Sequence, residues 1–172
     1  MIRSLMLAVT AVLTVSGFCS RTAAADVPLA KAVEAAQSAV GSCRSNGYNV
    51  TATVLDSDLS TRVVLRGDGA PDMTVEISRR KAYTVIKTGM SSGEFGKTVP
   101  AAPTVASPHA SGSRQLPDGV NGDPNLITWA GGVPIKLGGK IVGSIGVSGA
   151  PGGDKDEACA NAGLAKITGK LK

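Results

Sequence analysis

The sequence predicts an α+β (α/β) domain in which an antiparallel sheet is flanked by helices. Two pairs of strand-like segments, in which apolar residues tend to alternate, are each joined by a short turn, as antiparallel neighbours are. Segments with apolar residues at helical spacing lie before, between and after these pairs. The predicted strand pairs are residues 49–56 with 61–66 and residues 126–137 with 140–148.

The first predicted helix spans residues 27–45. Its apolar residues recur every three or four positions and form one stripe. Cys43 lies on this stripe, so we expect it to face the core. Asn46-Gly47 is a typical helix end.

The second helix is expected over residues 73–88. The preceding segment, 67–72, is rich in glycine and ends in Pro71 and Asp72. A proline with its fixed φ and an acidic residue both favour the first turn of a helix. Gly89 is expected to end this helix.

Residues 91–121 contain four prolines and little periodicity, which indicates a loop with at most one short helix. The last strand pair is joined by Gly138-Gly139, which tolerates the positive φ of a tight hairpin turn. Gly143 and Gly146 interrupt the final strand. We expect a bulge, another backbone or a ligand to come close there.

A glycine loop leads into the last helix. Asp154, with Glu157 three residues later, has the spacing of a capping box. The first and last predicted helices can pack side by side, which would bring Cys43 close to Cys159.

The first 25 residues have the three parts of a secretory signal peptide. Arg3 gives a basic start, residues 5–18 are apolar, and small residues precede Asp26. Cleavage near Ala25 would leave residues 26–172 as one domain in a secreted or periplasmic protein.

Two of the three cysteines, Cys43 and Cys159, lie beyond the predicted cleavage site. An oxidising destination and an even number of cysteines favour a disulfide between them. Two buried free thiols are the alternative.

The charge pattern excludes some partners. The chain has 18 Lys and Arg against 13 Asp and Glu, with no basic run and only 3% aromatic residues. Nucleic-acid binding requires a concentrated basic face, so we do not expect it. No second apolar stretch is long enough for integral membrane association.

The sequence offers no familiar catalytic machinery. The glycine loop before the last helix lacks the phosphate-binding motif, and acidic residues would repel a phosphate there. Gly146-Val147-Ser148-Gly149 does not complete a nucleophile elbow. One histidine and two distant cysteines do not make a zinc site. We therefore expect binding rather than catalysis, and assign no catalytic residue.

A basic cluster is the main candidate for ligand binding. Arg66, Arg80 and Lys81, with Asp68 beside them, flank the connection between a strand and the second helix. If they face one pocket, they can receive carboxylates such as haem propionates or a small organic acid. A solvated network of ion pairs is the alternative.

His109 is a candidate axial ligand for a haem iron, with a solvated surface histidine as the alternative. Other residue types able to ligate iron are present at Met73, Met90, Tyr48 and Tyr83. No C-x-x-C-H motif exists for covalent haem attachment.

Five blocks together resemble the GlcG/HbpS-like haem-binding family, which also includes the C-terminal domain of PduO-type proteins. They are residues 46–51, 66–71, 80–84, 131–135 and 143–149. Their order and spacing extend over most of residues 26–172, and together they are specific.

The resemblance implies a profilin-like domain with a five-stranded antiparallel sheet, homo-oligomers, and haem as a cofactor in some members. One exported member similar to this chain is an accessory to a sensor kinase, which makes such a kinase a candidate partner. The family name also implies haem degradation, for which we find no motif. The residues that match the family pattern are Arg66, Asp68, Gly69, Arg80, Lys81, Gly131 and Gly132.

Overall fold

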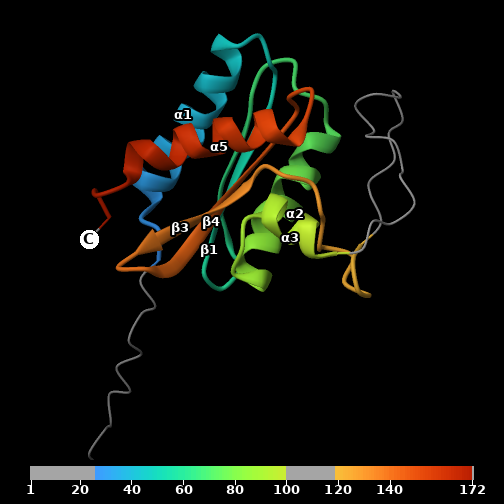
Figure 1. Ribbon diagram of the computed structural model, residues 1–172. Coiled ribbons are helices and arrows are strands. Elements are labelled where there is room, and N and C mark those ends of the chain that lie inside the picture. Colours follow the sequence, from blue (N-terminus) through green and yellow to red (C-terminus); the bar gives the residue numbers. More distant parts are fainter. Residues whose placement is uncertain (1–25, 100–118, 172) are drawn as a thin grey trace, which may run out of the picture.

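The protein is an antiparallel sheet with helices on both faces (Figure 1). The computed structural model describes residues 26–99 and 119–171. Within these ranges the helices are α1 (Leu29–Ser45), α2 (Met73–Thr88), α3 (Ser92–Thr98) and α5 (Gly153–Ile167). The strands are β1 (Thr51–Asp56), β2 (Thr61–Arg66), β3 (Gly132–Leu137) and β4 (Lys140–Ser148). They pair in the order β2-β1-β4-β3.

The α+β class and both hairpins are confirmed, but the strand count is not. The resemblance implied five strands, and the described residues form four. The strand predicted from residue 126 begins only at Gly132.

Helix side chains explain the shortened strand. The N–H of Ile127 donates to the hydroxyl of Thr84 at 3.0 Å, and the carbonyl of Trp129 accepts from Ser92 at 2.8 Å. These backbone groups are therefore bonded to α2 and α3 rather than to a neighbouring strand.

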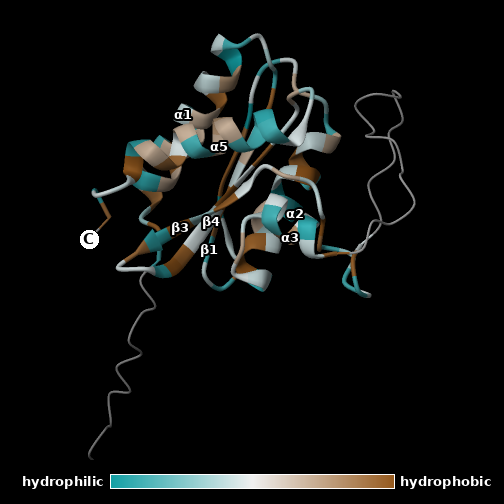
Figure 2. Cartoon of the chain, in the orientation of Figure 1, coloured by the Kyte–Doolittle hydropathy of each residue, from teal (hydrophilic) through white to brown (hydrophobic). Residues whose placement is uncertain are grey.

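One face of the sheet is apolar and is covered by α1 and α5 (Figure 2). The two helices approach closely, because a Cβ at Gly163 would lie 2.5 Å from the carbonyl oxygen of Ala35. The predicted disulfide is present: Cys43 of α1 is bonded to Cys159 of α5, with their Cα atoms 5.5 Å apart. It closes a long loop in the unfolded chain, which favours the folded state.

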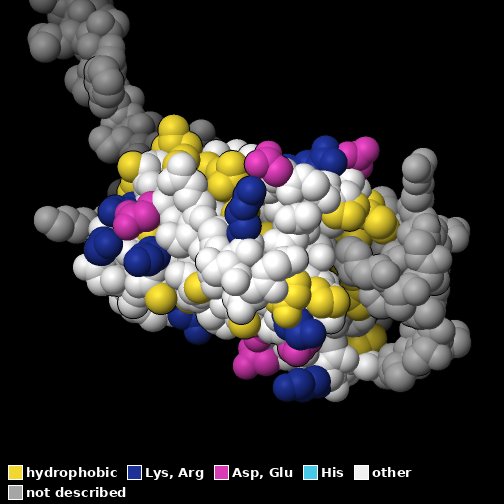
Figure 3. All heavy atoms as spheres, turned by 90° about the horizontal axis from the view of Figure 1, so that it is seen from above, with side chains coloured by type: hydrophobic (Ala, Val, Ile, Leu, Met, Phe, Trp, Pro, Cys, Tyr) yellow, Lys and Arg dark blue, Asp and Glu magenta, His cyan; other side chains and the backbone are white. Residues whose placement is uncertain are grey.

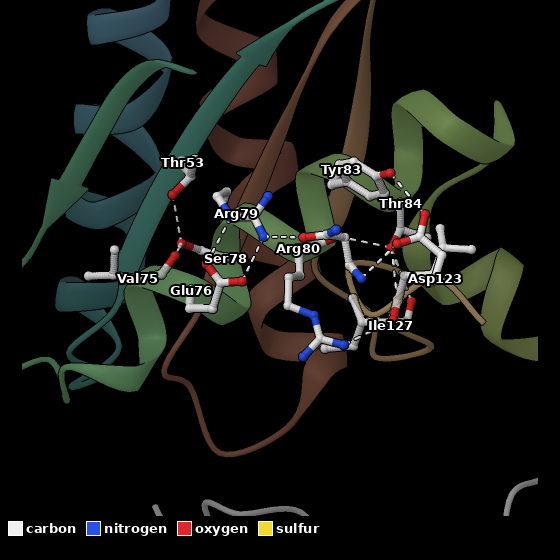
Figure 4. A network of polar contacts seen from close by, with 12 residues as sticks. Thr53, Val75, Glu76, Ser78, Arg79, Arg80, Tyr83, Thr84, Asp123 and Ile127 are labelled. Atoms are coloured by element: carbon white, nitrogen blue, oxygen red, sulfur yellow. Dashed lines mark hydrogen bonds and ion pairs between the residues drawn. The ribbon is translucent and has the colours of Figure 1, made fainter. Parts of the chain in front are cut away.

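The other face carries small and hydroxyl side chains and is covered by α2. Thr53 of β1 and Ser78 of α2 share a hydrogen bond at 2.7 Å (Figure 4). The hydroxyl of Ser144 donates to the carbonyl of Ala82 at 2.8 Å. A Cβ at Gly146 would overlap the carbonyl oxygen of Ser78. The glycine at position 146 is thus explained by the backbone of α2, whereas a Cβ at Gly143 would lie 2.5 Å from the carbonyl oxygen of Leu55 in β1.

The predicted capping box of the last helix is wrong. Gly152 is the N-cap of α5 and no side chain caps it, because the helix begins at Gly153 and Asp154 already lies in its first turn. A capping box occurs instead at α3. There the hydroxyl of Ser91 accepts from the N–H of Glu94 at 3.1 Å, and the Glu94 carboxylate accepts from the N–H of Ser91 at 2.9 Å.

Replacing Gly146 by alanine tests the close approach of α2. We expect Gly146→Ala to lower the free energy of unfolding by about 2 kcal/mol, because α2 must move away from β4. Gly41→Ala is the matched control. It lies in α1 with nothing within 4 Å of its Cβ, and should stabilise by about 0.5 kcal/mol. Urea unfolding of both variants measures this, and an unchanged midpoint for Gly146→Ala would contradict the packing.

Candidate functional site

A surface hollow lies where β2 connects to α2. It has a volume of about 610 Å³. We call it the α2 N-terminal hollow; its lining residues are Arg66, Gly69, Ala70, Pro71, Asp72 and Met73. Two of the seven residues that match the family pattern, Arg66 and Gly69, therefore line one hollow.

Arg66 is held over this connection by two acceptors. Its Nε and Nη2 donate to the carbonyl of Ala70 at 2.8 and 2.6 Å, and Nη2 pairs with Asp72 at 2.5 Å. The Asp72 side chain is 91% exposed, and ion pairs in water contribute at most about 1 kcal/mol. An incoming carboxylate can therefore replace Asp72 at little cost.

Gly69 and Asp68 have different roles in the same connection. Gly69 has a φ of +77°, and a Cβ there would lie 2.8 Å from Nδ2 of Asn49. Asp68 is not among the lining residues; its side chain is 94% exposed and pairs with Arg44 at 3.2 Å.

Lys81 is buried and has a structural partner. Lys81 is 1% exposed. Its Nζ donates to the carboxylate of Asp156 at 2.7 Å and to the carbonyl of Val147 at 2.9 Å. Burial lowers the pKa of the Lys81 ammonium, while the attraction of Asp156 opposes this. The pair joins α2 to α5 through the core, so Lys81 does not share a pocket with Arg66.

Gly131 and Gly132 lie beside this buried pair. Gly131 has a φ of +128°, and a Cβ there would be 2.8 Å from Nζ of Lys81. A Cβ at Gly132 would overlap the carbonyl oxygen of Lys81. Both glycines make the space in which Lys81 meets Asp156.

Arg80 lies on another side of α2, toward the segment before β3. It is 3% exposed, and its Nη2 donates to the carbonyl of Leu126 at 3.1 Å. Figure 4 shows Arg80 between the Arg79–Glu76 pair and Ile127. The basic residues singled out from the sequence are thus distributed around α2.

The segment before β3 makes two further side-chain hydrogen bonds with α2, at Asp123 and Asn125. The hydroxyl of Tyr83 donates to Asp123 at 2.9 Å (Figure 4). In addition, Nη2 of Arg79 donates to Asn125 at 2.6 Å. Burial raises the pKa of the Tyr83 phenol, and the hydrogen bond to Asp123 adds to this shift. Tyr83 is accordingly a protonated hydrogen-bond donor and not a free ligand.

The last candidates from the sequence are the axial ligand His109, a metal site and a membrane-spanning segment. His109 lies outside the described residues. Within residues 26–99 and 119–171, no group of three or more His, Cys, Asp or Glu side chains is arranged to hold a metal ion, and no helix is long and apolar enough to span a membrane. On the face seen in Figure 3, basic and acidic side chains are interspersed.

Sequence reasoning missed Asp156, although a signal for it exists. Asp156 shares one buried face of α5 with Cys159, Ala160 and Gly163. A charged residue on a buried helix face requires a buried partner. Two charged residues of α2, Arg80 and Lys81, are buried, and Lys81 is the partner of Asp156. Met73 was named from the sequence only as a residue type able to ligate iron, and its place in one hollow with Arg66 and Asp72 depends on the folded connection.

The buried pair predicts a large stability effect. We expect Lys81→Met to lower the free energy of unfolding by about 3 to 5 kcal/mol, because it leaves Asp156 as a buried charge. Adding Asp156→Asn should recover part of this loss. Arg44→Ala, which removes an exposed ion pair, should cost less than about 1 kcal/mol. Equal losses for Lys81→Met and Arg44→Ala in urea would show that the buried pair is not important.

Comparison with known proteins gives a family match over most of the chain. A family model described as "Haem degrading protein HbpS-like" matches residues 27–165. The crystal structure of HbpS superposes with a TM-score of 0.69 at 32% identity, covering 90% of this chain and 97% of that chain. A search of curated proteins found no significant match.

Two more distant structures share the fold. Klebsiella pneumoniae protein ORFY has a TM-score of 0.68 at 21% identity, covering 96% of this chain and 98% of that chain. A PduOC–haem complex has a TM-score of 0.67 at 18% identity, covering 83% of this chain and 95% of that chain.

Proposed function

Since this chain belongs to the HbpS-like family, we propose that it is an exported haem-binding protein. The observation that carries the proposal is the match to HbpS over nearly the whole of both chains. The absence of a recognisable acid–base pair in the sequence favours haem binding or sensing over haem degradation.

The α2 N-terminal hollow is the proposed haem contact. Its residue types suit the group: Arg66 can pair with a propionate, and Met73 presents a thioether of the kind that ligates haem iron. Gly69 leaves the rim of the hollow without a side chain. Bound haem would supply a redox-active iron, and the chain would supply its orientation and the charge partner for its carboxylates.

The remaining residues that match the family pattern would act indirectly. Gly131, Gly132 and Lys81 hold α2 in place beside β4, and the hollow is built on the first turn of α2. Arg80 lies within the same helix, and Asp68 lies in the connection that precedes it. His109 is the second candidate iron ligand.

A second candidate function is the binding of a small organic acid without haem. The observation that favours it is the chemistry of Arg66, whose guanidinium is paired with one carboxylate among residues 26–99 and 119–171, that of the exposed Asp72. A carboxylate of any source can use it. Haem and simple carboxylates therefore have to be compared directly.

Haem titration of residues 26–172 tests the proposal. We expect a saturable Soret band, and Arg66→Ala should weaken haem affinity about five-fold, since an exposed ion pair contributes up to about 1 kcal/mol. Arg44→Ala removes the same charge outside the hollow and should leave the affinity unchanged. No Soret band beyond that of a control protein would exclude haem binding, and thermal stabilisation by carboxylates alone would favour the second function.

Iron ligation is tested in the same titration. Met73→Leu keeps the size of the side chain and removes its sulfur, so a shifted Soret band would identify Met73 as a ligand. Met90→Leu is the matched control, and His109→Ala tests the other ligand type. Progressive loss of haem absorbance with a reductant would instead reveal degradation.

Export and assembly are part of the proposal. The disulfide between Cys43 and Cys159 is compatible with an oxidising compartment. When the full chain is produced in a secreting host, we expect an exported product that starts at Asp26 and contains the oxidised cysteine pair. Intact-mass spectrometry of the exported and cellular fractions measures this, and an uncleaved cellular product would contradict it.

Family resemblance also motivates two association proposals, a homo-oligomer and a sensor-kinase partner. Light scattering of the mature protein tests the first, since a monomeric mass would exclude it. Co-purification with an exported kinase domain tests the second.

A further inference from the structure

A second hollow lies between the Trp129–Ala130 segment and the start of α5. Its volume is about 300 Å³, and it shares no lining residue with the α2 N-terminal hollow. We call it the tryptophan hollow; it is lined by Lys81, Trp129, Ala130, Gly152, Gly153, Asp154 and Asp156. Its volume is at the lower end of small-molecule pockets, which suits a ligand of about one ring.

A buried ammonium forms part of its wall. The Lys81 side chain is 2% exposed, and an ammonium has three N–H donors. Within the part of the chain that the structure describes, two acceptors are bonded to Nζ, namely Asp156 and the carbonyl of Val147. One N–H of a buried cation is therefore left for an acceptor in the hollow.

The first turn of α5 adds donors at the same place. The first amides of a helix have no acceptor within the helix, and no side chain caps α5. Gly153 packs against Ala130, since a Cβ at Gly153 would lie 2.8 Å from the carbonyl oxygen of Ala130, and Gly152 lies beside the carboxylate of Asp154. These donors and Lys81 all favour an oxygen acceptor.

The charges at the hollow decide what kind of acceptor fits. Asp156 already balances Lys81, and the exposed Asp154 adds a further negative charge. An anion would be repelled there, whereas an uncharged carbonyl oxygen accepts the same hydrogen bonds without this repulsion. The ring of Trp129 supplies an apolar wall for a planar group.

We propose that the tryptophan hollow binds a small, uncharged, planar carbonyl compound, such as an aromatic carboxamide. Its carbonyl oxygen accepts from Lys81 and the first turn of α5, and its ring lies against Trp129. The site is separate from the proposed haem site and does not depend on it.

Trp129 is the one tryptophan of the chain, so its fluorescence reports directly on this hollow. Three probes of nearly equal shape and different charge are benzamide, benzoate and benzylamine. Titration of residues 26–172 should give a saturable fluorescence change with benzamide, and at least ten-fold weaker binding of the other two. A haem titration repeated in saturating benzamide should be unchanged, which separates the two sites.

Substitutions test the charge argument. Asp154→Asn should strengthen benzoate binding several-fold, because it removes the repelling carboxylate from an exposed position. Asp26→Asn, which removes the same charge at the start of the described chain, should leave the order of the probes unchanged. Lys81→Met should abolish benzamide binding if the variant folds, and the Asp154 variant decides the question if it does not.

Two results would contradict the proposed binding of an uncharged carbonyl compound. If benzamide gives no saturable change at millimolar concentration, the proposed site is excluded. If benzoate binds best to the unmodified protein, the charge argument is wrong. Neither result affects the haem proposal, which rests on the other hollow.

Discussion

The ion pair between Lys81 and Asp156 is the interaction on which the arrangement of the domain depends. Both side chains are 2% exposed, and their atoms meet at 2.7 Å. The carboxylate of Asp156 also accepts from the N–H of Ala150 at 2.9 Å, so it fixes the turn between β4 and α5 as well. A single buried charge in this position would be costly. The pair therefore keeps α2, on one face of the sheet, in a fixed position relative to α5, on the other face.

This coupling requires close packing, which the sequence provides through small residues. Gly131 and Gly132 leave room for Lys81, and Gly146 allows the backbone of α2 to touch β4. The apolar core lies on the opposite face, where α1 and α5 are joined by the disulfide. The sheet therefore has one face stabilised by burial of apolar area and one by hydrogen bonds between small side chains.

The functional proposals follow from the same division. The α2 N-terminal hollow is formed by a surface connection, so its Arg66 can exchange partners. The tryptophan hollow is formed against the buried ion pair, so its donor is fixed in place. A cation at the surface suits the carboxylates of a large ligand, and a buried donor suits one oxygen of a small ligand.

Local patterns in the sequence were sufficient for the α+β class, both hairpins, the limits of α2 and the pairing of Cys43 with Cys159. These features depend on residue periodicity, turn residues and the parity of the cysteines, all of which are local or compositional. The tertiary structure alone decided that the strand expected from residue 126 is shorter, since its backbone is bonded by Thr84 and Ser92. It also separated Lys81 from Arg66, because the direction of a side chain on a helix depends on which face the sheet covers.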